Sequence, residues 1–297
     1  MTTHIFDTIG YRDLANGIND ACEWLSDHGL DYPRTRVGEY RRHLNEMADY
    51  WEHGRIEELI KLRDFPTLMN SCHEASELSY IYKGLSSFSD LSVSKKLQEF
   101  IKGPPSSKNE NASSSNRGRN IAFELHMAAR FAAAGFTIDL TSEADVIVEI
   151  LEHEVFIECK RPQQNHQVNS NIKGAINQLE RRFPSARCPE RARGIIAVAI
   201  SKVFNPDMFL LNATTPETLS QKLSFITKAF IDHFEPKWKN PTDIRTIGVL
   251  VHLGVPAEIT SQNLLTNCHE FAIKTTFTNN QGLDVLTEIR DRIHPTA

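Results

Sequence analysis

The stretch EADVIVEILEHEVFIECKR, residues 143–161, decides the fold and sets charged residues against apolar runs. Asp145 opens the first apolar run, and Glu158 and Lys160 interrupt the second. Side chains two residues apart in a strand share a face, so Glu158 and Lys160 point the same way while Cys159 points opposite. Two carboxylates and an ammonium beside apolar strands are costly to bury unless they pair or hold a metal ion. The stretch therefore predicts a hairpin that carries a site for a divalent cation.

Composition sets the outer limits on the class of protein. A chain of 297 residues with 40% hydrophobic content can bury one large core or two modest ones. It has no run of about 18 apolar residues, so we expect no membrane span, and its first residues, MTTHIFDTIGYRD, do not resemble a secretory signal. The five cysteines are scattered and never form CxxC, which argues against disulfides or a cysteine zinc site and favours a cytoplasmic setting.

Charge is distributed unevenly along the chain. The formal net charge is −5, and residues 1–100 hold 17 acidic and 11 basic side chains. Residues 160–193 hold eight basic side chains against two acidic ones, so we expect a local positive face that attracts a polyanion. The alternative for each of these arginines is an ordinary solvated surface residue.

A polar stretch, KGPPSSKNENASSSN, separates two kinds of pattern. It predicts a flexible linker or an exposed loop over residues 103–116. Residues 1–102 show helical spacing, as at Leu14, Ile18, Cys22 and Leu25, and predict a helical domain. Its expected role is recognition or regulation, through a target, a trigger, a partner protein or a second copy of the chain.

Residues 117–297 alternate between helix and strand patterns. A helix is expected to run to about residue 134 and stop at Gly135, and further helices are expected over 172–183, 217–234 and 282–293. Strands are expected over 136–140, 145–151, 155–159, 194–201, 245–253 and 270–277, with the hairpin turn at 152–154. The order predicts an α/β fold with a mixed sheet flanked by helices.

The ordered set of these elements resembles the PD-(D/E)XK nuclease superfamily over residues 117–201. The matching parts are GRNIAFELHMAARF around Glu124, ADVIVEI around Asp145, FIECKRP around Glu158 and Lys160, and GAINQLERRF around Gln178. Ala144 stands where the name-giving pattern has proline. The resemblance implies that the second domain has a restriction-endonuclease-like core.

A second Glu-x-Lys, Glu235-Pro236-Lys237, serves as an internal control. It follows an amphipathic helix, contains proline and lacks an upstream strand that begins with aspartate, so we interpret it as a turn at a helix end. Strand context and Asp145 distinguish Glu158-Cys159-Lys160 from this copy. The alternative for the latter is a structural ion pair.

The chemistry assigns roles to the predicted site. Mg²⁺, for which Mn²⁺ can substitute, takes hard oxygen ligands, here Asp145 and Glu158. Lys160, held protonated by the two carboxylates, would orient water or stabilise developing charge. The resemblance implies that the main-chain carbonyl of Cys159 is a third ligand, that Glu124 reaches the metal through water, and that Gln178 helps to place metal, water or substrate. Surface roles are the alternatives for Glu124 and Gln178. Four basic residues are the candidates for phosphate contacts: Lys173, Arg161, Arg182 and Arg119.

The sequence lacks the motifs of other kinds of catalytic or nucleotide-binding site. His126, His153 and His166 lie near the motif but form neither H-x-x-x-H nor H-x-H, so they are interpreted as incidental. There is no GxxxxGK[ST] loop for nucleotides and no G-x-S-x-G elbow. The sequence therefore predicts a Mg²⁺-dependent DNA endonuclease similar to bacterial restriction or phage-defence effectors. An RNA-directed or structure-specific repair nuclease and a non-catalytic nucleic-acid-binding module are the alternatives.

Overall fold

A computed structural model gives the fold for residues 2–7, 10–88, 91–110, 116–141, 144–262, 264–277 and 282–293, with side chains from residue 10 onward. Ten α-helices occur in these ranges: α1 (Tyr11–Asp27), α2 (Arg36–Glu52), α3 (Ile56–Leu62), α4 (Phe65–Leu85), α5 (Leu91–Phe100), α6 (Arg117–Ala133), α7 (Val168–Arg182), α8 (Ser201–Phe204), α9 (Pro216–Phe234) and α10 (Leu283–Ile293). Short 3-10 turns lie at Ser107–Asn109, Asn165–Gln167, Phe183–Ser185, Glu235–Lys237 and Thr260–Gln262.

The strands form one mixed sheet in the order β1-β8-β7-β5-β4-β3-β2, with β6 beside β7. They are β1 (Thr2–Asp7), β2 (Thr137–Asp139), β3 (Val146–Ile150), β4 (His153–Lys160), β5 (Ala192–Ala199), β6 (Leu211–Ala213), β7 (Thr246–Ile259) and β8 (Leu264–Thr275). Strand β5 runs parallel to both β4 and β7, whereas β3 and β8 run antiparallel to their neighbours. The predicted α/β class and mixed sheet are confirmed.

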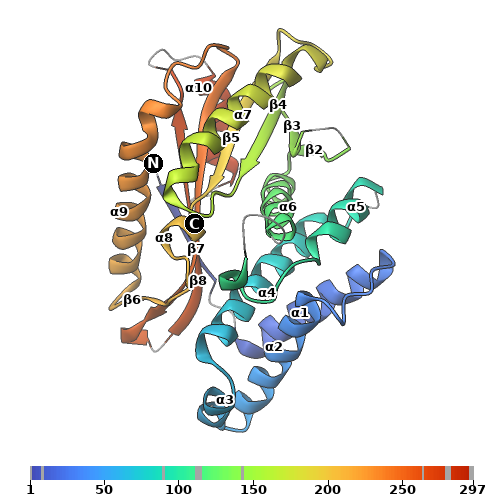
Figure 1. Cartoon of the computed structure of the whole chain (residues 1–297), viewed down its shortest axis with the longest axis vertical. Coiled ribbons are helices and arrows are strands. Elements are labelled where there is room, and N and C mark those ends of the chain that lie inside the picture. The colour runs from blue at the N-terminus through green and yellow to red at the C-terminus, as the bar shows by residue number, and fades with distance from the viewer. Residues whose placement is uncertain are drawn as a thin grey trace.

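The central strands are apolar on both sides because helices cover both faces of the sheet. In β5, Ile195 and Ala197 belong to the core shared with α6 and α10, while Ile196 and Val198 belong to the core beneath α7 and α9. Figure 1 shows this layering, with α9 along one side of the sheet and the N-terminal helices extending beyond α6. Alternate residues of each strand therefore pack into two separate cores.

The first hundred residues are helical, as predicted, but they are not an independent domain. The backbone of β1 pairs antiparallel with β8, from Thr2 opposite Ala272 to Asp7 opposite Asn267. A single hydrophobic core runs from Leu14 and the other apolar residues of the N-terminal helices into the sheet. The expected boundary at residue 102 is therefore wrong, because strand pairing and the shared core both cross it.

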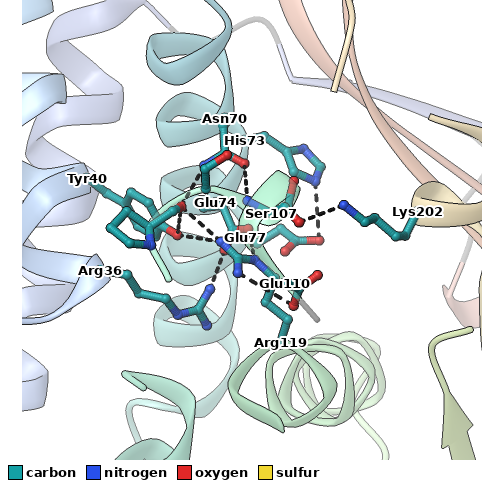
Figure 2. Close-up of polar contacts among 12 residues, drawn as sticks. Arg36, Tyr40, Asn70, His73, Glu74, Glu77, Ser107, Glu110, Arg119 and Lys202 are labelled. Carbon is teal, nitrogen blue, oxygen red and sulfur yellow. Dashed lines mark hydrogen bonds and ion pairs between the residues drawn. The ribbon is translucent and has the colours of Figure 1, made fainter. Parts of the chain in front are cut away.

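The expected flexible linker at 103–116 is also wrong for its described part, residues 103–110. The carbonyl oxygen of Pro105 accepts hydrogen bonds from Tyr40 Oη at 2.7 Å, Asn70 Nδ2 at 3.0 Å and Arg119 Nη2 at 2.9 Å. Lys202 Nζ donates to the Ser107 carbonyl at 2.6 Å (Figure 2). This polar segment is held between the N-terminal helices and the sheet by backbone acceptors that composition does not reveal.

The predicted hairpin is present with its turn shifted. Strands β3 and β4 pair antiparallel, but the turn is Leu151–Glu152, with φ of 47° and 63°, and His153 and Glu154 already belong to β4. Two successive positive φ angles are typical of the tight turn that suits the strand twist. Helix α6 ends before Gly135, at φ 76°, as predicted.

Candidate metal-binding active site

The end of β4 and the start of β3 form the site, because antiparallel pairing brings them to the same edge of the sheet. Asp145 immediately precedes β3, and Glu158, Cys159 and Lys160 end β4. The Cys159 N–H donates to Asp145 Oδ2 at 2.7 Å, which fixes the carboxylate beside the β4 backbone. The two segments that the sequence singled out therefore meet.

Lys160 lies between the two carboxylates. Its Nζ is 3.9 Å from Asp145 Oδ2 and 3.4 Å from Glu158 Oε2. The lysine side chain is 16% exposed, whereas that of Glu158 is fully buried. One ammonium thus interacts with both carboxylates, and the surrounding protein strengthens the electrostatic attraction between them.

Glu158 is the most deeply buried member of the site. Burial and the charge of Asp145 raise its pKa, while Lys160 and Arg182 oppose that shift. Arg182, at the end of α7, places its Nε 2.5 Å from Glu158 Oε1. The arginine expected to touch phosphate is therefore paired with the predicted metal ligand.

Glu124 approaches the same site from α6. Burial and the charge of Asp145 raise its pKa to about 7, although Lys96 and Lys160 lower it. Lys96 Nζ lies 2.5 Å from Glu124 Oε2. Lys96 comes from α5, in the N-terminal helices, so these helices contribute a charged group to the site. Sequence analysis missed it, because a lysine on an amphipathic helix gives no signal of the carboxylate it reaches.

The donor set fits a hard divalent cation. Asp145 raises the pKa values of both Glu124 and Glu158, so each glutamate lies near enough to Asp145 to be repelled by its charge. The N–H and C=O of a strand residue project to the same side, so the Cys159 carbonyl faces the side of Asp145. Carboxylate and carbonyl oxygens are the ligands that Mg²⁺ and Mn²⁺ prefer.

The other predicted residues divide into two groups. Gln178 is half-buried and Lys173 is exposed, and both lie on α7. Each side chain is therefore accessible to a substrate. Arg161 pairs with Glu110 at 3.0 Å and is mostly buried. Arg119 is 4% exposed, and its Nε lies 2.5 Å from Glu74 Oε1. The assignment of Arg119 to phosphate is wrong for this conformation, because its guanidinium is engaged in the interior.

Acidic side chains from other parts of the fold pair with several arginines of the basic run at 160–193. Arg187 lies 3.7 Å from Glu149 and 3.6 Å from Glu154, and Arg191 pairs with Glu152 at 2.8 Å. With Arg161 and Arg182 also paired, acidic partners from distant segments offset much of the expected positive face. The second Glu-x-Lys forms the 3-10 turn Glu235–Lys237 after α9, as predicted.

Comparison of the chain with family models, with curated proteins and with solved structures finds no match. Among the described helices, none combines the length and the apolar character needed to cross a membrane.

Proposed function

We propose that this chain is a metal-dependent phosphodiesterase of the PD-(D/E)XK kind, and that it cleaves DNA. The observation that carries the proposal is the Lys160 ammonium, 3.9 Å from Asp145 and 3.4 Å from Glu158. Acids that can hold a cation and a lysine that can face a phosphate stand together at one edge of the sheet. Glu124 adds a third carboxylate near Asp145, whose charge raises the pKa of Glu124. A structural ion-pair network is the alternative explanation of these contacts.

Each residue has a role in the proposed reaction. Asp145, Glu158 and the Cys159 carbonyl would hold Mg²⁺ or Mn²⁺, with Glu124 acting through water. When bound, the ion lowers the pKa of water and offsets charge on the phosphate. Lys160 stabilises the negative charge that builds on the phosphate oxygens. The Cys159 N–H keeps Asp145 oriented through Oδ2.

Arg182 and Lys96 neutralise carboxylates of the site and take no direct part in the reaction. Each pairs with a carboxylate at 2.5 Å, and so offsets the charge of Glu158 and Glu124 respectively. With Glu158 engaged by a cation, Arg182 would be able to contact a phosphate from α7. Exposed Lys173, on the same helix, is a further phosphate contact in this proposal.

The biological setting belongs to the proposal as well. A bacterial restriction or phage-defence endonuclease acting in the cytoplasm is the analogy we favour, with the N-terminal helices as the surface for a partner protein or a second copy. The alternatives are an RNA-directed or structure-specific repair nuclease and a non-catalytic nucleic-acid-binding module.

Cleavage assays on the purified full chain test the proposal. Supercoiled plasmid, linear DNA and RNA are each incubated with Mg²⁺, Mn²⁺ or EDTA. We expect metal-dependent nicking of DNA that Asp145→Asn and Lys160→Met each reduce by at least about a hundredfold. Lys237→Met is the matched control, because it alters the lysine of the second Glu-x-Lys and should keep full activity.

The outcomes separate the alternatives. Preference for RNA or for branched DNA would select the second kind of nuclease. Tight binding to nucleic acid without cleavage, unchanged in Asp145→Asn, would favour the binding module. Cleavage that survives both site substitutions would place the chemistry elsewhere and overturn the proposal.

A further inference from the structure

Buried histidines from three elements gather where α6 meets the sheet. His126 on α6, His252 on β7 and His269 on β8 are 1%, 2% and 1% exposed. One ring nitrogen of each lies within 4.8 Å of those of the other two. A fourth histidine, His73 on α4, stacks on His269 at 6.2 Å between ring centroids. We call His126, His252 and His269 the histidine cluster.

A guanidinium lies beside the cluster. Arg130 Nε lies 3.3 Å from His126 Nε2. Imidazole coordinates a metal ion in its neutral form, through one ring nitrogen.

The spacing within the cluster suits a tetrahedral ion. His252 Nε2 and His269 Nδ1 are 3.1 Å apart. Two nitrogens bound at 2.0–2.1 Å in a tetrahedral zinc site lie about 3.3 Å apart. The hydrogen between these two rings belongs to one of them, and binding requires that ring to take its other tautomer. The third ring, that of His126, must move by up to about 1.5 Å to join them, because its nitrogen lies within 4.8 Å of theirs and the tetrahedral spacing is about 3.3 Å.

A glycine keeps the space between the rings open. A Cβ atom on Gly254 would lie 3.3 Å from ring atoms of His252, His269 and His73 at once. The buried Nδ1 atoms of His73, His126 and His252 have no hydrogen-bond partner within the described part of the chain. Unsatisfied buried nitrogens are costly in an apolar interior. A cation held by His252 Nε2 and His269 Nδ1 would leave His252 Nδ1 unchanged, but it would satisfy the Nδ1 of His126 or His73 if that ring supplied a further ligand.

A small pocket and a carboxylate lie beside the cluster. The pocket, of about 40 Å³, is lined by His73 and His252, together with Glu77. Glu77 Oε1 lies 3.8 Å from His73 Nε2 (Figure 2). A carboxylate behind a histidine orients the ring and supplies negative charge, which a cation close to Arg130 needs.

We propose that the histidine cluster binds one divalent transition-metal ion, zinc by ligand type, with His73 or water in the fourth position. Imidazole nitrogens suit zinc, whereas the oxygens around Asp145 suit magnesium, so the two sites select different ions. The buried setting makes this a structural ion that ties α4 and α6 to β7 and β8. The proposal does not depend on the nuclease function.

Metal content tests the proposal directly. The full chain is dialysed against a chelator, loaded with zinc, desalted and analysed by elemental mass spectrometry. We expect one zinc per chain, a higher midpoint temperature of unfolding, and visible absorption of tetrahedral type when cobalt replaces zinc. Folded wild-type protein that holds less than a tenth of a zinc per chain would overturn the proposal.

Substitutions assign the ion to the cluster. His126→Gln and His269→Gln should abolish loading, while exposed His166→Gln should not change it. Gly254→Ala keeps every imidazole and should weaken zinc affinity about tenfold, since it fills the space between the rings. Asp145→Asn should leave loading unchanged. Loss of zinc in Asp145→Asn with retention in Gly254→Ala would place the ion at the carboxylates and overturn the proposal, even if the histidine variants fail to fold.

Discussion

Glu74 is the centre of a buried charge network whose contribution to the free energy of unfolding can be measured. Its two oxygens lie 2.6 Å from Arg36 Nη1 and 2.5 Å from Arg119 Nε, and its side chain is 7% exposed (Figure 2). Burial raises its pKa, but the two guanidiniums outweigh burial and bring the pKa from 4.5 to about 2. Glu74 therefore stabilises the fold when ionised.

The magnitude follows from that shift. A difference of about 2.5 between the unfolded and folded pKa values, at roughly 1.4 kcal/mol for each unit, is worth about 3.5 kcal/mol at pH 7. The sign is that of a lowered carboxylate pKa, so the contribution is complete above about pH 4.5 and is lost as the pH falls towards 2. Glu74→Gln, which leaves two buried guanidiniums without their carboxylate, should lower the free energy of unfolding by about 3–5 kcal/mol at pH 7.

Urea unfolding of wild type and Glu74→Gln at pH 7 and pH 3.5 provides the test. The difference in unfolding free energy between the two proteins should narrow by about 1.4 kcal/mol at pH 3.5, because Glu74 takes up a proton in the unfolded wild type while it stays ionised in the folded one. Glu52→Gln is the matched control, because Glu52 pairs with Arg12 at 2.6 Å on the exposed surface and should contribute little. A Glu74→Gln effect no larger than that of Glu52→Gln, or a gap that does not change with pH, would refute the reasoning.

Three further predictions concern the site, the sheet and the helix packing. Lys96→Met should lower metal-dependent cleavage about tenfold in a plasmid assay, whereas exposed Lys95→Met should not, and equal activity in both would remove Lys96 from the site. Burial raises the pKa of Glu270 to about 8, so wild type should lose stability as the pH rises from about 4.5 to 8. Between pH 5 and pH 8, the free energy of unfolding of Glu270→Gln should rise by roughly 3 kcal/mol relative to that of wild type. Urea titrations measure both, and unfolding free energies that change in parallel with pH would contradict this. Gly84→Ala on α4 should lower the free energy of unfolding by about 1–3 kcal/mol, because the added Cβ would lie 2.7 Å from the Cβ of Ala129 on α6. Gly174→Ala on α7 meets nothing within 4 Å and should stabilise by roughly 0.5–1 kcal/mol, and thermal melts in which both raise the midpoint would contradict the packing argument.

Much of the candidate site could be predicted because its pattern is local. The alternation around Glu158 and Lys160 places both on one face of β4, and a short hairpin necessarily returns the chain beside Asp145. What the pattern missed was the exact turn, since a positive φ at Leu151 and Glu152 runs against residue preference. Lys96 and the pairing of Arg182 with Glu158 were also out of reach, because each joins segments far apart in the chain.

The sequence by itself determined the alternation of helix and strand and the charged hairpin, because period and turn chemistry act over a few residues. Tertiary structure alone decided that β1 joins the sheet, that Arg119 is buried against Glu74, and that His126 meets His252 and His269. These contacts depend on which distant surfaces pack together. Burial then fixes the charge of each group by removing water, which no local pattern of residues encodes.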